Sequence, residues 1–311
     1  MTTSIHNPSV RLVLKLFLIG GLALVLWVPT LMVMILVEER SGRRDEVRAE
    51  VAATWGAEQT LVGPVVTVPF RERTADESGK ETVRYARFLP ESLDVRGTLR
   101  PEIRNRSIYE VVVYTTELAI QGAFAKPTFD GWGVADEDIL WDRATIAVGV
   151  GDLRGLAELP ELHWGGRTLK LEAGSGSRTI SPGLVASLGS NGFVSDAEPD
   201  AVVPFSAVIS VRGTGELHIV PAGRETRVEL HSTWPNPGFD GAFLPETREL
   251  GSDGFQAAWR VLQANRSVAQ RWRDVGDMDY SVVHSLRQEA FGVRLLPPVD
   301  GYQKTTRSLK Y

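Results

Sequence analysis

Cysteine is absent from the 311 residues of this sequence. Disulfide bonds, zinc sites built from cysteine and catalytic thiols are therefore excluded. The sequence also lacks a Walker loop, a GxGxxG motif and an HExxH motif, the common signatures of nucleotide, dinucleotide and zinc-protease sites. The histidines show no metal-ligand spacing and stand at His6, His163, His218, His231 and His284. We therefore expect no cofactor and no metal centre.

An excess of positive charge is also missing. The net charge is −5 at pH 7, and the isoelectric point is near 5.7. Nucleic-acid-binding domains are typically basic, so we expect no nucleic acid among the partners. The remaining composition, with 43% hydrophobic and 23% charged residues, is that of an ordinary globular protein.

One long apolar run stands near the N-terminus, and no later segment is comparably apolar. Residues 16–37 carry no charge, and about 20 such residues suffice to span the core of a bilayer. We predict a cytoplasmic tail over residues 1–11 and a transmembrane helix over residues 12–37, with the lipid bilayer as a partner. A cleaved secretion signal is disfavoured because the run is too long and offers no small-x-small cleavage site. A buried core helix is disfavoured because so apolar a helix would need protein on all sides.

The charges that flank this run leave its orientation open. The positive residues are Arg11 and Lys15 before the run, and Arg40, Arg43, Arg44 and Arg48 after it. Their distribution favours a cytoplasmic location for the large domain that follows. Long domains, however, cross the membrane with little regard to charge, and a short tail before one span is the usual layout of a signal anchor.

Residues 38–56 have the composition of a helix. Val47, Val51 and Trp55 recur at every fourth position and form an apolar stripe, and Gly56 is a natural stop. We predict a helical stalk that continues the membrane helix. An amphipathic helix lying on the membrane surface is the alternative, disfavoured because the stripe is only three residues long.

From residue 57 onward, apolar and polar residues alternate as they do in β-strands. Segments rich in Val, Ile, Tyr and Thr cover residues 61–70, 83–89, 93–99, 108–124, 139–150, 169–171, 205–220 and 226–232. Many short strands and few helices predict a mainly β fold, with a large antiparallel, β-sandwich-like domain over residues 57–303. Residues 174–204 are rich in Ser, Gly, Asp and Pro, and we expect a long loop or an internal domain boundary there.

Residues 255–261 fit two patterns. Alternate residues from Phe255 to Val261 are apolar, as in a strand, whereas Phe255, Ala258 and Leu262 are spaced as on one face of a helix. The period cannot decide the matter for so short a run. We predict a strand.

A stiff aromatic segment covers residues 234–245. Its three prolines fix φ, and its three aromatic residues offer a large contact area. One interpretation is a rigid contact surface made of Trp234, Pro235, Pro237, Phe239 and Phe243. The alternative is a plug that closes one end of the β core and buries these rings.

Two polar segments have a structural and a functional interpretation. Asp152 and Arg154 either form a polar binding site or stand in a turn that the aspartate begins, and the turn is favoured. Residues 304–311 form a basic segment. It either contacts anionic lipid or serves as a connector, and the connector is favoured.

A pair of carboxylates that hydrolyses glycans is a further hypothesis. The acids around the aromatic segment are Asp240, Glu246, Glu249 and Asp253. Acidic residues number 39 of 311, so that some pair is always available. No other catalytic set stands out, and the sequence favours a protein that is not an enzyme.

Motifs spread over nearly the whole chain form a characteristic set. They are Glu38-Glu39-Arg40, Arg44-Asp45-Glu46-Val47, Trp55-Gly56, Gln59-Thr60-Leu61-Val62-Gly63-Pro64, Phe88-Leu89-Pro90, Ile108-Tyr109-Glu110-Val111, the Asp152-Leu153-Arg154-Gly155 turn, the Trp-Pro-x-Pro-x-Phe pattern at Trp234, and Pro298-Val299-Asp300-Gly301-Tyr302-Gln303-Lys304. Together they resemble the CreD family of inner-membrane proteins, also described as cell-envelope-integrity proteins.

The resemblance implies a bacterial inner-membrane protein whose large domain, after the first span, lies in the periplasm. It also implies several further spans after the motif that ends at Lys304. The printed sequence stops at Tyr311 without a second apolar run. We therefore expect either a truncated gene or fragment, or a chain whose C-terminal spans are lost. The resemblance carries over no catalytic residue.

Anchor, composition and resemblance together predict a membrane-anchored envelope protein that acts by binding. Its periplasmic β domain would support envelope integrity or a response to envelope stress and β-lactams, to which the family is tied. The alternatives are a periplasmic hydrolase acting on glycans, with acids from the region 234–253, and a sensory or transport partner subunit. The ligand, any envelope partner and the oligomeric state are not encoded in a recognisable motif.

Overall fold

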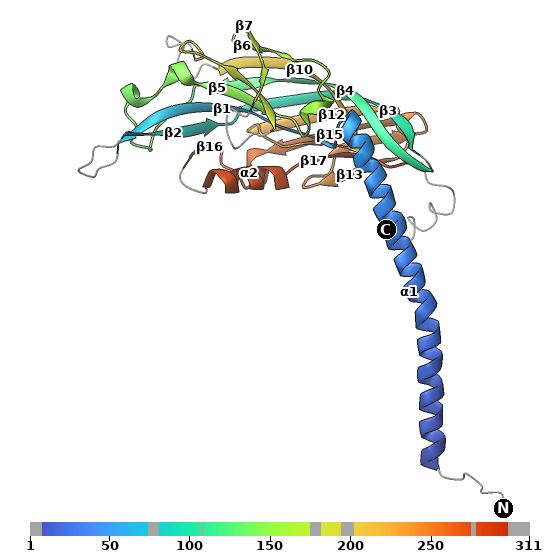
Figure 1. The fold of residues 1–311 in the computed structure, drawn as a ribbon. Coiled ribbons are helices and arrows are strands. Elements are labelled where there is room, and N and C mark those ends of the chain that lie inside the picture. Colours follow the sequence, from blue (N-terminus) through green and yellow to red (C-terminus); the bar gives the residue numbers. More distant parts are fainter. Residues whose placement is uncertain are drawn as a thin grey trace, which may run out of the picture. The chain divides into compact units, whose positions relative to one another are not determined.

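The computed structural model describes residues 8–73, 81–106, 108–174, 182–193, 202–274 and 278–297 (Figure 1). The chain divides into two compact units, Met1–Ala49 and Glu50–Tyr311. Most of the predicted tail and the predicted basic segment 304–311 lie outside the described residues.

The first unit consists of helix α1 (Pro8–Trp55), whose last residues belong to the second unit. This helix has 48 residues and runs without a break through the predicted span and the predicted stalk. By length and composition it is able to cross a membrane, and none of its apolar window is buried in protein. An exposed apolar helix of this length needs an apolar surrounding, which a bilayer provides.

The second unit is built from two β-sheets. The nine-stranded sheet contains β13 (Pro237–Gly241), β17 (Phe291–Leu295), β11 (Glu216–Ile219), β1 (Gln59–Arg73), β5 (Thr145–Gly149), β9 (Gly183–Ser187) and β8 (Glu172–Ala173) in this order, with β2 (Glu81–Phe88) on β1 and β16 (Arg271–Arg273) on β2. The eight-stranded sheet has the order β14 (Thr247–Gly251), β15 (Gly254–Leu262), β12 (Glu225–Ser232), β3 (Ser92–Arg106), β4 (Tyr109–Ala125), β10 (Val202–Thr214), β6 (Glu161–Trp164) and β7 (Arg167–Lys170).

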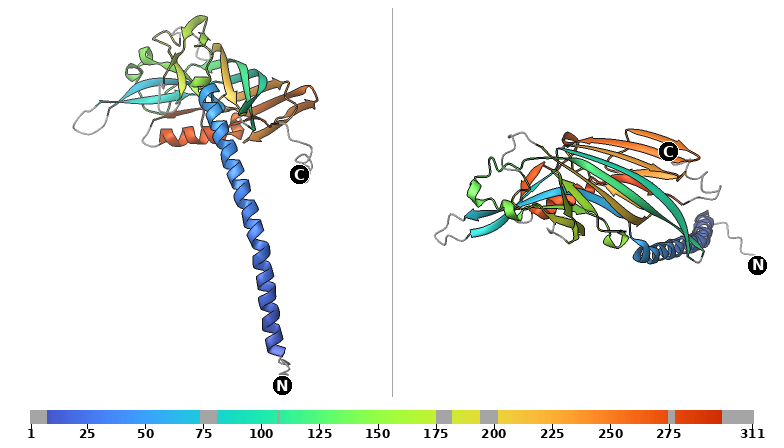
Figure 2. Two further views of the ribbon diagram at one scale, coloured as in Figure 1. Left: turned by 45° about the vertical axis from the view of Figure 1, so that its right-hand side comes forward. Right: turned by 90° about the horizontal axis from the view of Figure 1, so that it is seen from above.

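The two sheets share one hydrophobic core. Buried residues of both sheets form a single cluster, which includes Val66 and Ile146 from one sheet and Leu93, Ile120 and Trp259 from the other. The layering is visible when the molecule is turned (Figure 2). The predicted mainly β, sandwich-like fold with an N-terminal helix is confirmed. Each sheet is mixed rather than purely antiparallel, because β1 pairs with β11 and β3 pairs with β12 in parallel.

Alternation of side chains explains the strands that the sequence indicated most clearly. In β12, every second residue from Thr226 to Ser232 is buried and the intervening ones are exposed. Residues 255–261 form part of strand β15, as predicted, and Trp259 lies in the core with 2% exposure. A polar face toward solvent and an apolar face toward the core is the pattern of a half-buried sheet.

Other segments differ from the sequence prediction. Residues 205–220 form two strands of different sheets, β10 and β11, because Gly215 adopts a positive φ of 73° and breaks the extended chain between them. In the predicted strand 139–150, the 3₁₀ helix η2 (Trp141–Arg143) precedes β5. Further 3₁₀ helices are η1 (Asp136–Asp138), η3 (Leu153–Gly155) and η4 (Gln263–Asn265).

Helix α2 (Met278–Gln288) was not anticipated from the sequence. It precedes β17 and lies near β16 (Figure 1). Its apolar stripe is short, with Leu286 buried and Val282 half-buried. A stripe of this length gives a weak periodic signal.

The predicted boundary within residues 174–204 is described only in part. Strand β9 lies inside this range and pairs with β5 in the nine-stranded sheet. Residues 175–181 and 194–201 lie outside the described residues. The boundary stays a prediction.

Candidate functional site

The Asp152 turn lies where the chain leaves helix α1 and enters the β domain. The carboxylate of Asp152 accepts hydrogen bonds from the backbone N–H of Ala57, at 2.9 Å, and from that of Arg154, at 3.0 Å. The guanidinium of Arg154 donates to the same carboxylate through Nε. The side chain of Asp152 is only 12% exposed, whereas that of Arg154 is 60% exposed. The aspartate therefore fixes the chain just after the helix.

The surroundings of Asp152 keep it charged. Burial alone would raise the pKa of its carboxyl group. The guanidinium of Arg154 and the backbone N–H groups of Ala57 and Arg154 stabilise the carboxylate, and together they hold its pKa below the usual range. The turn is therefore a charged, hydrogen-bonded anchor at neutral pH.

Gln59 connects this turn to the eight-stranded sheet. Its buried side chain donates through Nε2 to the carbonyl oxygens of Asp152, at 3.1 Å, and Arg212, at 2.8 Å, and its Oε1 accepts the N–H of Asp152. The hydroxyl of Thr214 donates to the carbonyl of Gly56 at 2.7 Å. Buried polar groups need such partners, so these bonds hold the two sheets at the end of the helix.

Trp55, the last residue of α1, is held by two arginines. The guanidinium carbons of Arg104 and Arg212 lie 4.6 Å and 5.3 Å from its ring centroid. Its Nε1 donates to the carbonyl of Tyr114 at 3.3 Å. Cations over the face of an indole are attracted by its π electrons. We call the following set the helix junction: Trp55, Gly56, Ala57, Gln59, Arg104, Asp152, Arg154, Arg212 and Thr214.

Only part of the helix junction is visible in the sequence. The sequence predicts a turn at Asp152 and Arg154 and an apolar stripe that includes Trp55. The partners of these residues come from β3, β4 and β10, which are far away in the sequence. Only the pairing of the strands brings them together.

The first residue of the predicted contact surface, Trp234, is buried in the protein. Trp234 is 8% exposed, and its Nε1 donates to the carbonyl of Leu296 at 2.9 Å. Pro235 is exposed, and Pro237 is the first residue of β13 and half-buried. Proline suits the start of an edge strand, where one N–H donor is dispensable.

The phenylalanines of this segment pack between the sheets. Phe239 lies edge-to-face against Phe255 and Trp259, with 5.7 Å between ring centroids in both pairs. Phe243 makes the same kind of contact with Phe291 at 5.8 Å. The contacts of Phe239 join β13 of one sheet to β15 of the other, and the contact of Phe243 joins the segment after β13 to β17. They favour the plug over the contact surface, and the contact surface stays a prediction.

Asp240 belongs to an ion-pair network at the β13 edge of the nine-stranded sheet. Its Oδ1 lies 2.9 Å from Nε2 of His218, and its Oδ2 lies 2.8 Å from a guanidinium nitrogen of Arg294. Arg294 also pairs with Glu216 at 2.8 Å. The network links β11, β17 and β13, which lie side by side. These contacts give Asp240 a role in holding the edge strand.

The other acids of the glycan hypothesis belong to the opposite sheet. Glu249 lies on β14, Asp253 lies between β14 and β15, and Glu246 precedes β14. All three are exposed, and Glu249 and Asp253 line a shallow hollow together with His231. The structure thus places Asp240 on one sheet and the other three acids on the other.

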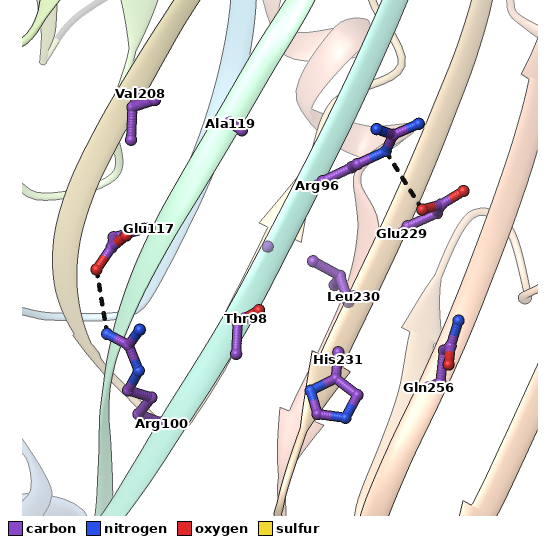
Figure 3. Close-up of a pocket in the computed structure, with 11 residues that line it drawn as sticks. Arg96, Thr98, Arg100, Glu117, Ala119, Val208, Glu229, Leu230, His231 and Gln256 are labelled. Carbon is purple, nitrogen blue, oxygen red and sulfur yellow. Dashed lines mark hydrogen bonds and ion pairs between the residues drawn. The ribbon is translucent and has the colours of Figure 1, made fainter.

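The outer face of the eight-stranded sheet contains a polar hollow of about 390 Å³ (Figure 3). Two ion pairs cross it, from Arg96 on β3 to Glu229 on β12 at 3.3 Å, and from Arg100 on β3 to Glu117 on β4 at 3.1 Å. All four side chains are more than half exposed. The remaining polar groups of the hollow are those of Thr98, His231 and Gln256.

A second hollow of about 640 Å³ adjoins the first, and the two share Ala119 and Val208. Val208 and Leu159 provide an exposed apolar floor, with 53% and 61% exposure. The polar rim is formed by Gln121, Glu158, Glu161, His163 and Ser206. We call the two hollows together the outer groove, which crosses β6, β10, β4, β3, β12 and β15. No local sequence pattern indicates this groove, since it depends on which strands are neighbours.

Metal ligands do not cluster in the part of the chain that the structure describes. No group of three or more His, Cys, Asp or Glu side chains there has the arrangement needed to hold a metal ion.

Comparison with known proteins identifies the family. The family described as "Inner membrane protein CreD" matches residues 11–311. The chain is 29% identical over 302 residues to the inner membrane protein CreD of Escherichia coli strain K12, covering 96% of this chain and 64% of that protein. The chain thus spans just under two thirds of the length of that relative.

Among solved structures, an M1 zinc metallopeptidase from Deinococcus radiodurans gives a TM-score of 0.26 at 8% identity, over 58% of this chain and 39% of that chain. A likeness this low carries no argument about fold or chemistry. The family match, in contrast, extends from the apolar helix to the last residue of the sequence, as the motifs predicted. The chain belongs to the CreD family of inner membrane proteins.

Proposed function

We propose that this chain is a membrane-anchored envelope protein whose β domain lies in the periplasm and binds an extended polar partner in the outer groove. Membership of the CreD family supports a location in the inner membrane. Helix α1 is long and apolar enough to be the membrane anchor. The observation that carries the binding role is the outer groove itself, a long polar hollow on an exposed sheet face.

The side chains of the outer groove suit binding better than stabilisation. The pairs Arg96–Glu229 and Arg100–Glu117 are exposed, and such pairs contribute little to folding. Their donors and acceptors are accessible to a partner, beside a floor of Ala119 and Val208 on which an apolar surface can rest. Two adjoining hollows of about 390 Å³ and 640 Å³ offer room for an extended partner such as a polymer segment.

Binding without catalysis is part of this proposal. It is supported by the placement of the candidate acids, because Asp240 pairs with His218 and Arg294 on one sheet while Glu249 and Asp253 belong to the other. A role in envelope integrity or in the response to β-lactams is proposed from the family resemblance.

The experiment blocks the outer groove without touching its charges. Ala119 lines both hollows, so that Ala119→Trp fills the place where they meet. Lys170→Trp is the matched control, since Lys170 is exposed on the edge strand β7 and lines neither hollow. Cells lacking the native gene would be complemented with each variant and grown with a β-lactam or a detergent. We expect A119W to fail and K170W to succeed, with equal thermal unfolding, and equal complementation would refute the binding role.

A sensory role is a second candidate, favoured by one observation. Strand β3 carries both Arg100 of the outer groove and Arg104 of the helix junction, and β10 carries Val208 and Arg212 in the same way. A partner in the groove would therefore lie four residues from the side chains that hold Trp55. Occupying the groove with a bulky maleimide on Thr98→Cys should change hydrogen exchange in residues 50–57. Unchanged exchange there would refute the sensory role.

A further inference from the structure

A separate cavity of about 400 Å³ lies against the nine-stranded sheet. Its walls come from the start of β1, the end of β5, strand β11, and the C-terminal end of α2 with Ala290 beyond it. The outer groove, in contrast, lies on the other sheet. The volume falls in the range of about 300–1,000 Å³ that is usual for small-molecule sites.

The cavity combines two opposite charges with an apolar floor. Glu58, just before β1, and Arg287, on α2, are both exposed and belong to its wall. Val62 and Val150 line it as well and are buried, with 3% and 4% exposure. The wall of this cavity therefore contains an acidic residue, a basic residue and two apolar side chains.

The backbone segments that form the cavity wall pack tightly against each other. A Cβ atom at Gly151 would lie 2.7 Å from the carbonyl oxygen of Glu58 and 2.7 Å from the nitrogen of Thr60, so that the backbones touch there. His218 also lines the cavity, and its ring is oriented by the bond from Nε2 to Asp240. A site with fixed walls loses little conformational entropy when it binds a ligand.

We propose that this cavity binds a small zwitterion, namely a free amino acid with a small apolar side chain or a short peptide of such residues. Arg287 would pair with the carboxylate of the ligand and Glu58 with its ammonium group. The apolar side chain would rest on Val62 and Val150. Glu58 and Arg287 also have partners within the protein. The proposal therefore rests on their charges and their positions in the cavity wall, and it does not require either residue to be unpaired. It does not depend on the outer groove.

The test uses the full chain in lipid nanodiscs and isothermal titration with L-alanine, D-alanine and dialanine. Acetate and methylammonium, which each carry one of the two charges, are the controls. We expect saturable binding of at least one of the three zwitterions and at least about tenfold weaker binding of both controls, because a hydrogen bond to a charged group is lost with each. Acetate or methylammonium binding as tightly as the zwitterions, or no binding of any zwitterion, would overturn the proposal.

Variants then place the ligand in this cavity. Arg287→Gln and Glu58→Gln should each weaken zwitterion binding at least about tenfold. Arg227→Gln, an exposed position on the other sheet, is the matched control and should leave it unchanged. If the charge variants unfold, Ala290→Leu narrows the cavity and keeps both charges, and it should weaken binding at least about tenfold. Full binding by a folded A290L protein would place the ligand elsewhere and refute the site.

Discussion

Asp152 and Ala57 are joined by a hydrogen bond of 2.9 Å from the backbone N–H of Ala57 to the carboxylate of Asp152, although 95 positions separate them in the sequence. Ala57 follows helix α1, and Asp152 follows strand β5. A single half-buried carboxylate thus connects the chain just after helix α1 to the turn that follows β5.

Loss of the Asp152 side chain should destabilise the β domain. Asp152→Ala removes the acceptor of the Ala57 N–H, and an unsatisfied, partly buried donor costs about 1–3 kcal/mol. Denaturant unfolding of the full chain, followed by tryptophan fluorescence, measures the change. Asp142→Asn, an exposed acid on η2, is the control and should unfold like the wild type. Equal stability of D152A and wild type would mean that water replaces the carboxylate without cost.

The contribution of Asp152 to the stability of the protein should decrease on acidification. Its pKa is lowered in the folded protein, so the native state favours the carboxylate. The stabilisation is fully present above the unfolded-state pKa, which is about 3.9 for aspartate, and is lost as the pH falls through the lower folded-state value. The stability difference between wild type and D152A should therefore be constant from pH 7 to pH 5 and shrink below about pH 4. Urea titrations at several pH values test this, and a difference that grows on acidification would contradict it.

Trp55 should contribute to the stability of the β domain through two separable contacts. Trp55→Phe keeps an aromatic ring under Arg104 and Arg212 but removes the bond from Nε1 to Tyr114, at a cost of about 1 kcal/mol. Trp55→Ala removes the ring as well and should cost about 2–3 kcal/mol in total. Unfolding of the β domain in denaturant gives both values. Trp27→Phe, an exposed tryptophan of α1, should have no effect on it, and equal losses in W55F and W55A would rule out a role for the ring.

The parts of the fold that follow from local pattern could be read from the sequence. Strand β12 shows strict alternation, and the uncharged, apolar residues 16–37 need an apolar surrounding. Pattern fails where one residue changes the path of the chain. Gly215 divides an apparently continuous strand between two sheets, and only its backbone conformation, a φ of 73°, shows this.

The candidate sites were harder to predict than the fold. The outer groove needs β3 beside β12, two strands with more than a hundred residues between them, and no local pattern encodes that pairing. The aromatic residues at 234, 239 and 243 were visible in the sequence, but their exposure was not. A rigid contact surface and a buried plug need the same residue types, and only their neighbours distinguish them.

Asp240 should hold the edge strand β13 on the nine-stranded sheet. Asp240→Asn removes the charge that faces both His218 and Arg294, so β13 should open more often while the central strands stay protected. Hydrogen exchange followed by mass spectrometry should show faster exchange over Pro237–Gly241. Asp253→Asn, on the other sheet, serves as the control. Unchanged exchange in D240N would show that backbone pairing with β17 alone secures the strand.

The orientation of the chain can be decided with single cysteines, because the native sequence has none. Thr98→Cys places a thiol on the exposed face of the eight-stranded sheet, and Ser4→Cys places one before the apolar helix. In cells with a permeabilised outer membrane, a membrane-impermeant maleimide should label T98C at once and S4C only after the inner membrane is opened. That result follows if the β domain is periplasmic. The reverse labelling pattern would place the β domain in the cytoplasm, as the arginines after the helix suggest by number, and the proposed envelope role would fall with it.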